Sequence, residues 1–126
     1  MGKKAAVRKY SDTEANAKIK QLRISPQKLN LVAGLIRGMR ASEALVQLQF
    51  SNKRISRDLK ALLESAIANA ENNHDLDIDR LVVYRVNVGK SLTMKRFRAR
   101  ARGRGAKILK PFSNIEIVVR ELEEDY

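Results

Sequence analysis

The chain contains no cysteine and no tryptophan, and only two prolines among its 126 residues. The absence of cysteine excludes disulfide bonds and thiolate zinc sites, and it fits a reducing compartment. No run of residues is apolar for long enough to cross a membrane, and residues 1–10 lack the apolar stretch of a secretory signal. We therefore expect a soluble cytoplasmic protein with no membrane partner.

Acidic residues are scarce beside basic ones. The chain has 26 Lys and Arg against 14 Asp and Glu, which gives a formal net charge of +12. A charge of this size opposes compact folding, and a polyanionic partner would relieve the repulsion. No carboxylate occurs between Leu81 and Ile115, whereas residues 75–79 and 121–126 are acidic. This separation of charge is typical of a nucleic-acid footprint.

Hydrophobic periodicity predicts an α+β fold: three helices packed on a short antiparallel sheet, with a long protruding β-hairpin. Ser25-Pro26 supplies an N-cap and the first residue of a helix that stops near Gly38. A second helix is expected to open at Ser42, with Leu45 and Leu48 inward and Phe50 as a further candidate. The third helix, over about residues 55–70, has the most regular apolar stripe.

A period of two predicts the strands. A short strand is expected over residues 17–24. Two longer runs flank a basic, glycine-containing segment and indicate a hairpin at about residues 81–120. In its first arm we expect one face to carry Val82, Tyr84, Val86 and Val88. From residue 81 to a tip near Arg98 the arm is about seventeen residues, or roughly 55 Å, so the body cannot cover it.

These elements predict one folded domain with two tails. Residues 1–16 are interpreted as a basic N-terminal arm. Residues 17–122 form a single α+β RNA-binding domain that includes the extended hairpin. Residues 121–126 are interpreted as an acidic tail.

The densest charge lies in residues 90–110, which hold nine Lys and Arg and no carboxylate. Within them Arg98, Arg100, Arg102 and Arg104 recur at every second position, so an extended backbone would direct all four guanidinium groups to one face. Such a row suits the phosphates of a nucleic acid. A disordered arginine arm is the alternative interpretation. A second basic cluster lies at the start of the third helix, where positive charges are unfavourable beside the helix dipole. It is interpreted either as a second phosphate-binding patch or as an ordinary solvated face. Its residues are Lys53, Arg54, Arg57 and Lys60.

Little in the sequence indicates other chemistry. His74 stands alone in a polar loop. Asp75, Asp77 and Asp79 alternate as at the start of a calcium loop, but the required glycine and glutamate do not follow. No glycine-rich phosphate loop precedes a helix. We expect no enzyme, no metal site and no cofactor, and because only Phe97 lies in the basic run, we expect phosphate and shape contacts to outweigh base stacking.

Several motifs, in this order, closely resemble one family, that of the bacterial large-subunit ribosomal protein L22. They are Ser25-Pro26-Gln27-Lys28, Leu35-Ile36-Arg37-Gly38, Glu64-Ser65-Ala66-Ile67-Ala68-Asn69-Ala70-Glu71-Asn72, Met94-Lys95-Arg96 and Arg100-Ala101-Arg102-Gly103-Arg104. The resemblance extends from about Ala17 to Leu122. It implies a structural ribonucleoprotein component that binds ribosomal RNA, bridges RNA domains during subunit assembly and lines the polypeptide exit tunnel in translation.

Carried over by position, the resemblance also implies roles for single residues. Met94, Lys95 and Arg96 would form the tunnel-facing tip, beside the nascent polypeptide. The partners would be large-subunit ribosomal RNA and neighbouring ribosomal proteins. The predicted RNA-binding residues are Lys18, Lys20, Arg23, Lys28, Lys53, Arg54, Arg57, Lys60, Lys90, Lys95, Arg96, Arg98, Arg100, Arg102, Arg104, Lys107 and Lys110.

Two other functions are compatible with the charge. The second and third helices could form a DNA-binding helix-turn-helix, although the strongest charge lies on the hairpin and not on a recognition helix. The chain could also be an RNA-annealing chaperone with a disordered basic arm.

Overall fold

The computed structural model describes residues 13–99 and 105–122. Strand β1 begins at Glu14, earlier than the predicted residue 17, so residues 14–16 belong to the sheet and not to the basic arm. The elements are β1 (Glu14–Leu22), α1 (Pro26–Ile36), α2 (Ala41–Gln49), α3 (Ser56–His74), the 3-10 helix η1 (Ile78–Arg80), β2 (Leu81–Ala99) and β3 (Gly105–Glu121).

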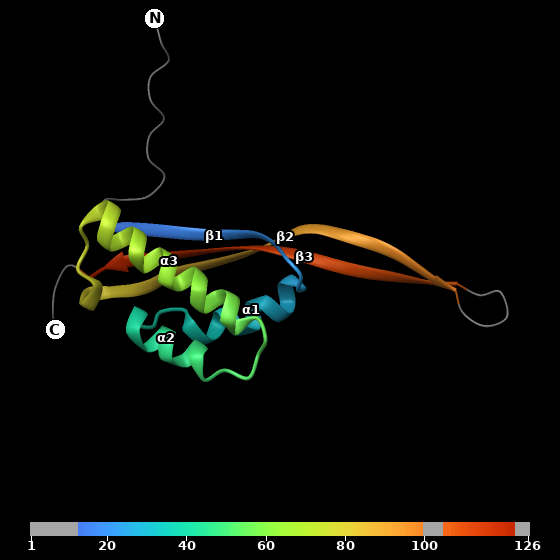
Figure 1. The fold of residues 1–126 in the computed structure, drawn as a ribbon, viewed down its shortest axis with the longest axis horizontal. Coiled ribbons are helices and arrows are strands. Elements are labelled where there is room, and N and C mark those ends of the chain that lie inside the picture. The colour runs from blue at the N-terminus through green and yellow to red at the C-terminus, as the bar shows by residue number, and fades with distance from the viewer. Residues whose placement is uncertain (1–12, 100–104, 123–126) are drawn as a thin grey trace, which may run out of the picture.

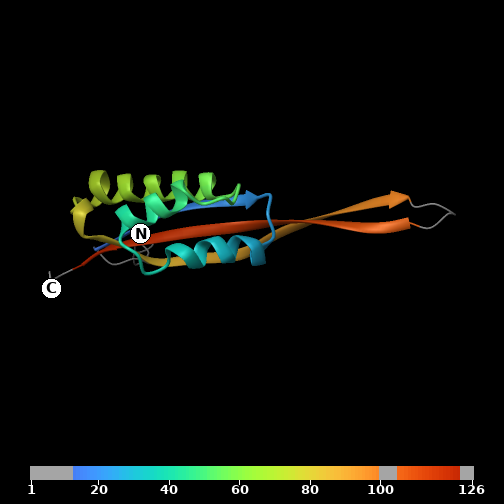
Figure 2. The ribbon, with the colours of Figure 1, turned by 90° about the horizontal axis from the view of Figure 1, so that it is seen from below.

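The three strands form one antiparallel sheet in the order β1-β3-β2, so β3 is central. The helices cover one face of it: α3 packs on β1 and β3, α1 packs on β2 and β3, and α2 lies against α3 (Figures 1 and 2). The core between these layers includes the fully buried Leu29, Ile36, Leu59, Leu63 and Ile117. The predicted α+β fold is confirmed.

The helix boundaries follow the local signals. Pro26 is the first residue of α1, and the Ser25 hydroxyl accepts a hydrogen bond from the Lys28 backbone N–H at 3.3 Å. The inward candidate Phe50 is wrong, because its side chain is 76% exposed. A helix turns by about 200° over two residues, so Phe50 lies opposite Leu48, which is buried in the core.

A bulge in β2 reverses the alternation of its faces. Between Val83 and Arg85 the pairing with β3 skips one residue, Tyr84. One extra residue exchanges the inward and outward positions that follow it. The prediction that Val82, Tyr84, Val86 and Val88 share a face is therefore wrong. The residues of β2 in the core or packed on it are Leu81, Val83, Val86 and Val88.

The outer edge of β2 is covered at this bulge by the segment that follows α1. The Gly38 N–H donates to the Val83 carbonyl at 3.0 Å, and the Val83 N–H donates to the Met39 carbonyl at 2.8 Å. Gly38 has a φ of 80°, a conformation that is easiest for a residue without Cβ. Arg37 adds hydrogen bonds from its guanidinium group to the Val86 carbonyl at 2.8 and 3.2 Å. These contacts give the backbone groups in this part of the edge strand hydrogen-bond partners within the chain.

The hairpin leaves the body where β1 ends. The last pair between β1 and β3 is Leu22 with Ser113, whereas β2 and β3 stay paired as far as Ala99 with Gly105. Beyond residue 90 the sheet is thus a two-stranded ribbon, which extends past the helices in both views (Figures 1 and 2). The ten residues 90–99 span about 30 Å at 3.3 Å each. The predicted hairpin is present, but its first nine residues belong to the body.

The root of the ribbon is fixed to the body by one buried hydroxyl. Ser113 is fully buried, and its Oγ donates a hydrogen bond to the Ile24 carbonyl at 2.6 Å. Gln21 has a φ of 63°, and its backbone N–H donates to the Asn114 side chain at 3.1 Å. These bonds turn the chain out of β1 and hold the start of α1 beside the ribbon.

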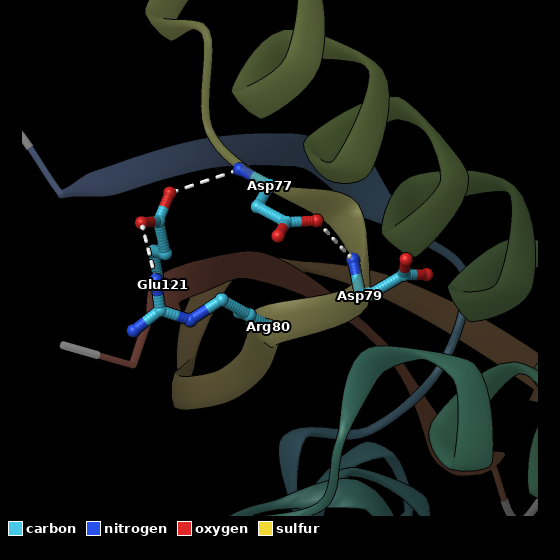
Figure 3. Close-up of polar contacts among 4 residues, drawn as sticks. All are labelled: Asp77, Asp79, Arg80 and Glu121. Atoms are coloured by element: carbon cyan, nitrogen blue, oxygen red, sulfur yellow. Dashed lines mark hydrogen bonds and ion pairs between the residues drawn. The ribbon is translucent and has the colours of Figure 1, made fainter. Parts of the chain in front are cut away.

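The opposite end of the sheet is closed by carboxylates. Glu121 accepts a hydrogen bond from the Asp77 N–H at 2.9 Å and lies 3.7 Å from the Arg80 guanidinium group, and the Asp77 side chain caps η1 by accepting from the Asp79 N–H at 3.0 Å (Figure 3). In the described residues, no group of three His, Cys, Asp or Glu side chains is placed to hold a metal ion. The alternating aspartates close a turn of the backbone.

Replacing Ser113 by alanine is expected to destabilise the chain by roughly 1–3 kcal/mol, because the Ile24 carbonyl loses its buried donor. Urea unfolding followed by circular dichroism measures the change. Ser65→Ala, at an exposed position of α3, is the matched control and should be near neutral. Equal stability of the two variants would contradict the role of this hydrogen bond.

Gly105 lies beneath the ring of Phe97 near the far end of the ribbon, and a Cβ at Gly105 would overlap that ring. Gly105→Ala should displace the ring and shift its proton resonances, at a cost in stability below about 1 kcal/mol because the ring is exposed. Gly89→Ala, where nothing lies within 4 Å, is the control. The unchanged chain should show nuclear Overhauser contacts between the Phe97 ring and the Gly105 α protons. Their absence would refute this packing.

Candidate nucleic-acid interface

The structure describes most of the predicted RNA-binding residues in full, some by their backbone alone, and some not at all. Arg100, Arg102 and Arg104 lie outside the described residues, and for Arg96, Arg98 and Lys107 the structure describes only the backbone, in the paired strands. The remaining cations are exposed, apart from the half-buried Lys60: Lys18, Lys20, Arg23, Lys28, Lys53, Arg54, Arg57, Lys60, Lys90, Lys95 and Lys110. Within the described part of the chain none of this last group forms an ion pair. Their charge is available to a partner.

The cluster at the start of α3 gathers around one hollow. Lys53, Arg54, Arg57 and Lys60 all line it. The helix itself has no side-chain N-cap, because Ile55 occupies that position. Its first two backbone N–H groups, of Ser56 and Arg57, donate to the Lys53 and Arg54 carbonyls at 3.1 and 3.4 Å. Cations beside a helix start are unfavourable by roughly 0.3–1 kcal/mol each at the surface, and a bound phosphate would relieve that repulsion.

A second hollow lies where the ribbon leaves the body, and we call it the root groove. Its volume is about 590 Å³. Its cations are Arg23 from the loop after β1, Lys28 from α1, Arg54 from the loop before α3, and Lys110 from β3. Ser25 lies among them, and the apolar part of the lining is Ile24, Met94, Leu109, Pro111 and Phe112. The fold therefore brings cations from three separate parts of the chain, residues 23–28, 54 and 110, to one apolar surface.

Arg54 lines both hollows. The cluster at the start of α3 and the cations of the root groove therefore form one continuous basic band across the body. Lys18 and Lys20 are not part of it, because they line a separate shallow hollow with Asn87 and Gly89.

The proposed tip residues lie in the paired ribbon. Met94 pairs with Lys110, and Lys95 pairs with Leu109, whereas the last pair that the structure describes is Ala99 with Gly105. Met94 also lines the root groove. Their position along the tunnel wall stays a prediction.

The sheet face that the helices leave open carries an ordered cluster that periodicity missed. The Tyr84 ring has the guanidinium carbons of Arg85 and Arg120 at 5.5 and 5.1 Å from its centroid, within the range of cation–π attraction. Arg85 also lies 3.9 Å from the Glu14 carboxylate. The bulge at Tyr84 hid this arrangement, because it moves the ring and Arg85 away from their expected faces.

None of the helices within the described residues is long and apolar enough to span a bilayer.

Comparison with known proteins agrees with this arrangement. The family model described as ribosomal protein L22p/L17e matches residues 17–120, which include most of β1, the three helices and all but the last residue of the hairpin strands. Curated relatives named "Large ribosomal subunit protein uL22" are similar over nearly their full length. The protein of Maricaulis maris is 66% identical over 124 residues, with 98% of each chain covered. That of Methylorubrum populi is 64% identical over 125 residues, covering 99% of this chain and 98% of its own.

A third relative of the same name, from Mesorhizobium japonicum, is 63% identical over 124 residues, covering 98% of this chain and 96% of its own. Identity at this level over whole chains leaves no room for a different fold or a different family. With its helical body, central shared strand and basic hairpin all inside the matched region, the chain belongs to the L22p/L17e family of ribosomal proteins.

Proposed function

We propose that the chain is a structural component of the cytoplasmic large ribosomal subunit that binds ribosomal RNA, bridges RNA domains during assembly and lines the exit tunnel with its hairpin. Neighbouring ribosomal proteins and the nascent polypeptide are its further partners. Residues 17–122, together with residues 14–16 at the start of β1, act as one RNA-binding domain with the basic arm and the acidic tail on either side. The proposal rests on one observation: the ribbon carries a basic segment and extends past the body, which cannot cover it.

The ribbon supports RNA binding through its exposure. A lone two-stranded ribbon is only marginally stable in water, and this one carries Lys90, Lys95 and Lys110 as exposed cations. Surrounding phosphates would neutralise those cations and exclude water from the strands. Because the ribbon extends about 30 Å from the body, its far end and the body would touch separate RNA segments, as bridging requires.

The band on the body supports the same partner. Its cations form no ion pair within the described residues, whereas the Glu121 carboxylate, at the end of the sheet away from the ribbon, lies 3.7 Å from Arg80 and accepts from the Asp77 N–H (Figure 3). A surface evolved only for solubility would mix the two signs. Separation of this kind instead creates a field that attracts a polyanion.

The helix-turn-helix alternative is less well supported. Beyond its first two turns the exposed residues of α3 include Glu64 and Glu71, and these carboxylates would repel the phosphates beside a DNA groove. The annealing chaperone predicts an unpaired basic arm, whereas β2 and β3 are paired up to Ala99 and Gly105.

Replacing Arg98, Arg100, Arg102 and Arg104 together by alanine should weaken RNA binding and flatten its salt dependence. Each phosphate contact contributes about 0.7–0.9 to the slope of log K against log salt, so the slope should fall by up to about three. Filter binding of a large-subunit ribosomal RNA transcript over a series of salt concentrations measures it, and circular dichroism checks that the body stays folded.

The control removes the same number of charges from the N-terminal arm, by replacing Lys3, Lys4, Arg8 and Lys9 with alanine. This variant should keep most of the slope. If both variants flatten it equally, the slope reports net charge alone, and the special role of the hairpin is refuted.

A tagged copy of the chain expressed in cells should sediment with large ribosomal subunits and their precursors in a sucrose gradient. A structural subunit protein has a fixed place in the particle, so the tag should be present at about one copy per subunit. Recovery of the tag only in the light fractions, at every stage of growth, would overturn the proposed function.

A further inference from the structure

The root groove combines two kinds of surface that a single ligand would have to satisfy. Its four cations are Arg23, Lys28, Arg54 and Lys110, and no carboxylate lines it. Between them Leu109 is 56% exposed, beside the half-buried Met94 and Phe112. Apolar surface in water is unfavourable, and four cations gathered in one hollow repel one another.

The groove is held in shape by contacts already present in the free chain. The Ser113 hydroxyl binds the Ile24 carbonyl in one wall, and Ser25 caps the start of α1 in another. A register shift between Lys90 and Thr93 lies opposite the Pro111 wall and bends the ribbon there. The ligand therefore meets a largely formed site, and little ordering is required on binding.

Few ligands match both surfaces. Phosphate alone would neutralise the cations and leave the apolar side chains in water. Duplex RNA presents phosphates but keeps its bases stacked inside the helix. An unpaired nucleotide offers a flat base and a phosphate together, and the volume of about 590 Å³ is within the range in which proteins hold small molecules.

We propose that the root groove binds one unpaired nucleotide of the RNA, with its base against Met94, Leu109 and Phe112 and its flanking phosphates between Arg54 and Lys110. The inference rests on the proposed RNA binding and deepens it. The groove would read an extruded base at the point where the ribbon leaves the body, and so fix the ribbon's direction relative to the RNA.

The test compares two fluorescent probes on the full chain: pentauridylate and an abasic pentamer of the same length and charge. Fluorescence anisotropy at fixed salt gives both affinities. In the unchanged chain pentauridylate should bind about tenfold more tightly, the scale of stacking one base. Leu109→Ser should bring the ratio of the two affinities close to one, while the affinity for the abasic pentamer stays the same.

Leu92→Ser is the matched control, because Leu92 is 40% exposed in the same ribbon but does not line the groove. It should keep the tenfold ratio. The measurements are repeated in a Phe97→Ala background, so that the other exposed ring of the ribbon does not contribute. Arg54→Gln should weaken both probes by the same factor.

Three results would overturn the nucleotide site. A ratio near one in the unchanged chain means that the groove takes phosphate only. Equal losses in Leu92→Ser and Leu109→Ser mean that the base binds elsewhere. The third result uses a peptide that contains leucine and glutamate. If this peptide displaces pentauridylate from the unchanged chain and binds the Leu109→Ser variant tenfold more weakly, the groove binds a protein segment and not a nucleotide. Binding of both probes with equal affinity and steep salt dependence leaves the proposed function standing, whereas binding of neither overturns both.

Discussion

One strand belongs to two structures, and the rest of the molecule depends on this sharing. From Ser113 to its C-terminal end, β3 is the central strand of a three-stranded sheet beneath the helices. Before Ser113 the same strand is half of a two-stranded ribbon. Because hydrogen bonding continues through the junction, the direction of the ribbon is set by the buried sheet. The core residues Ile115, Ile117 and Val119 thus hold the ribbon as well as the body. A flexible linker at Ser113 would leave the same charges with no defined direction.

The junction also explains why the loop after β1 matters. When β1 ends, β3 loses a partner on one side, and an unpaired strand edge is exposed unless the chain covers or avoids it. Pro111 lies just beyond that point and has no N–H to leave unpaired. The turn from Gln21 to Ser25 covers the last part of the edge through Ser113 and Asn114. The same turn brings Arg23 and the start of α1 to the ribbon, so closing the sheet edge also forms the root groove.

Sequence patterns predicted those features that depend on neighbouring residues. The start of α1 follows from Ser25-Pro26, the stripe of α3 from its apolar spacing, and the hairpin from two β-rich runs around a basic segment. The face assignment in β2 failed at Tyr84, because a bulge is stabilised by a partner distant in sequence, here the Met39 carbonyl. The root groove could not be predicted for the same reason. Its cations were all identified one by one, but their convergence depends on how three separate parts of the chain pack together.

Charge separation is the last consequence of the shared strand. Glu121 meets Asp77 and Arg80 at one end of the sheet, whereas the cations of the root groove lie at the other end, where the ribbon begins, and no carboxylate lines that groove. Carboxylates near the ribbon would stabilise the free chain by forming ion pairs with its cations, but each carboxylate would then compete with phosphate for the same cation. Unpaired cations have the opposite effect: they weaken the isolated protein and strengthen the complex. The stability of the ribbon is therefore coupled to its partner, and the extended form is favoured most where polyanion surrounds it.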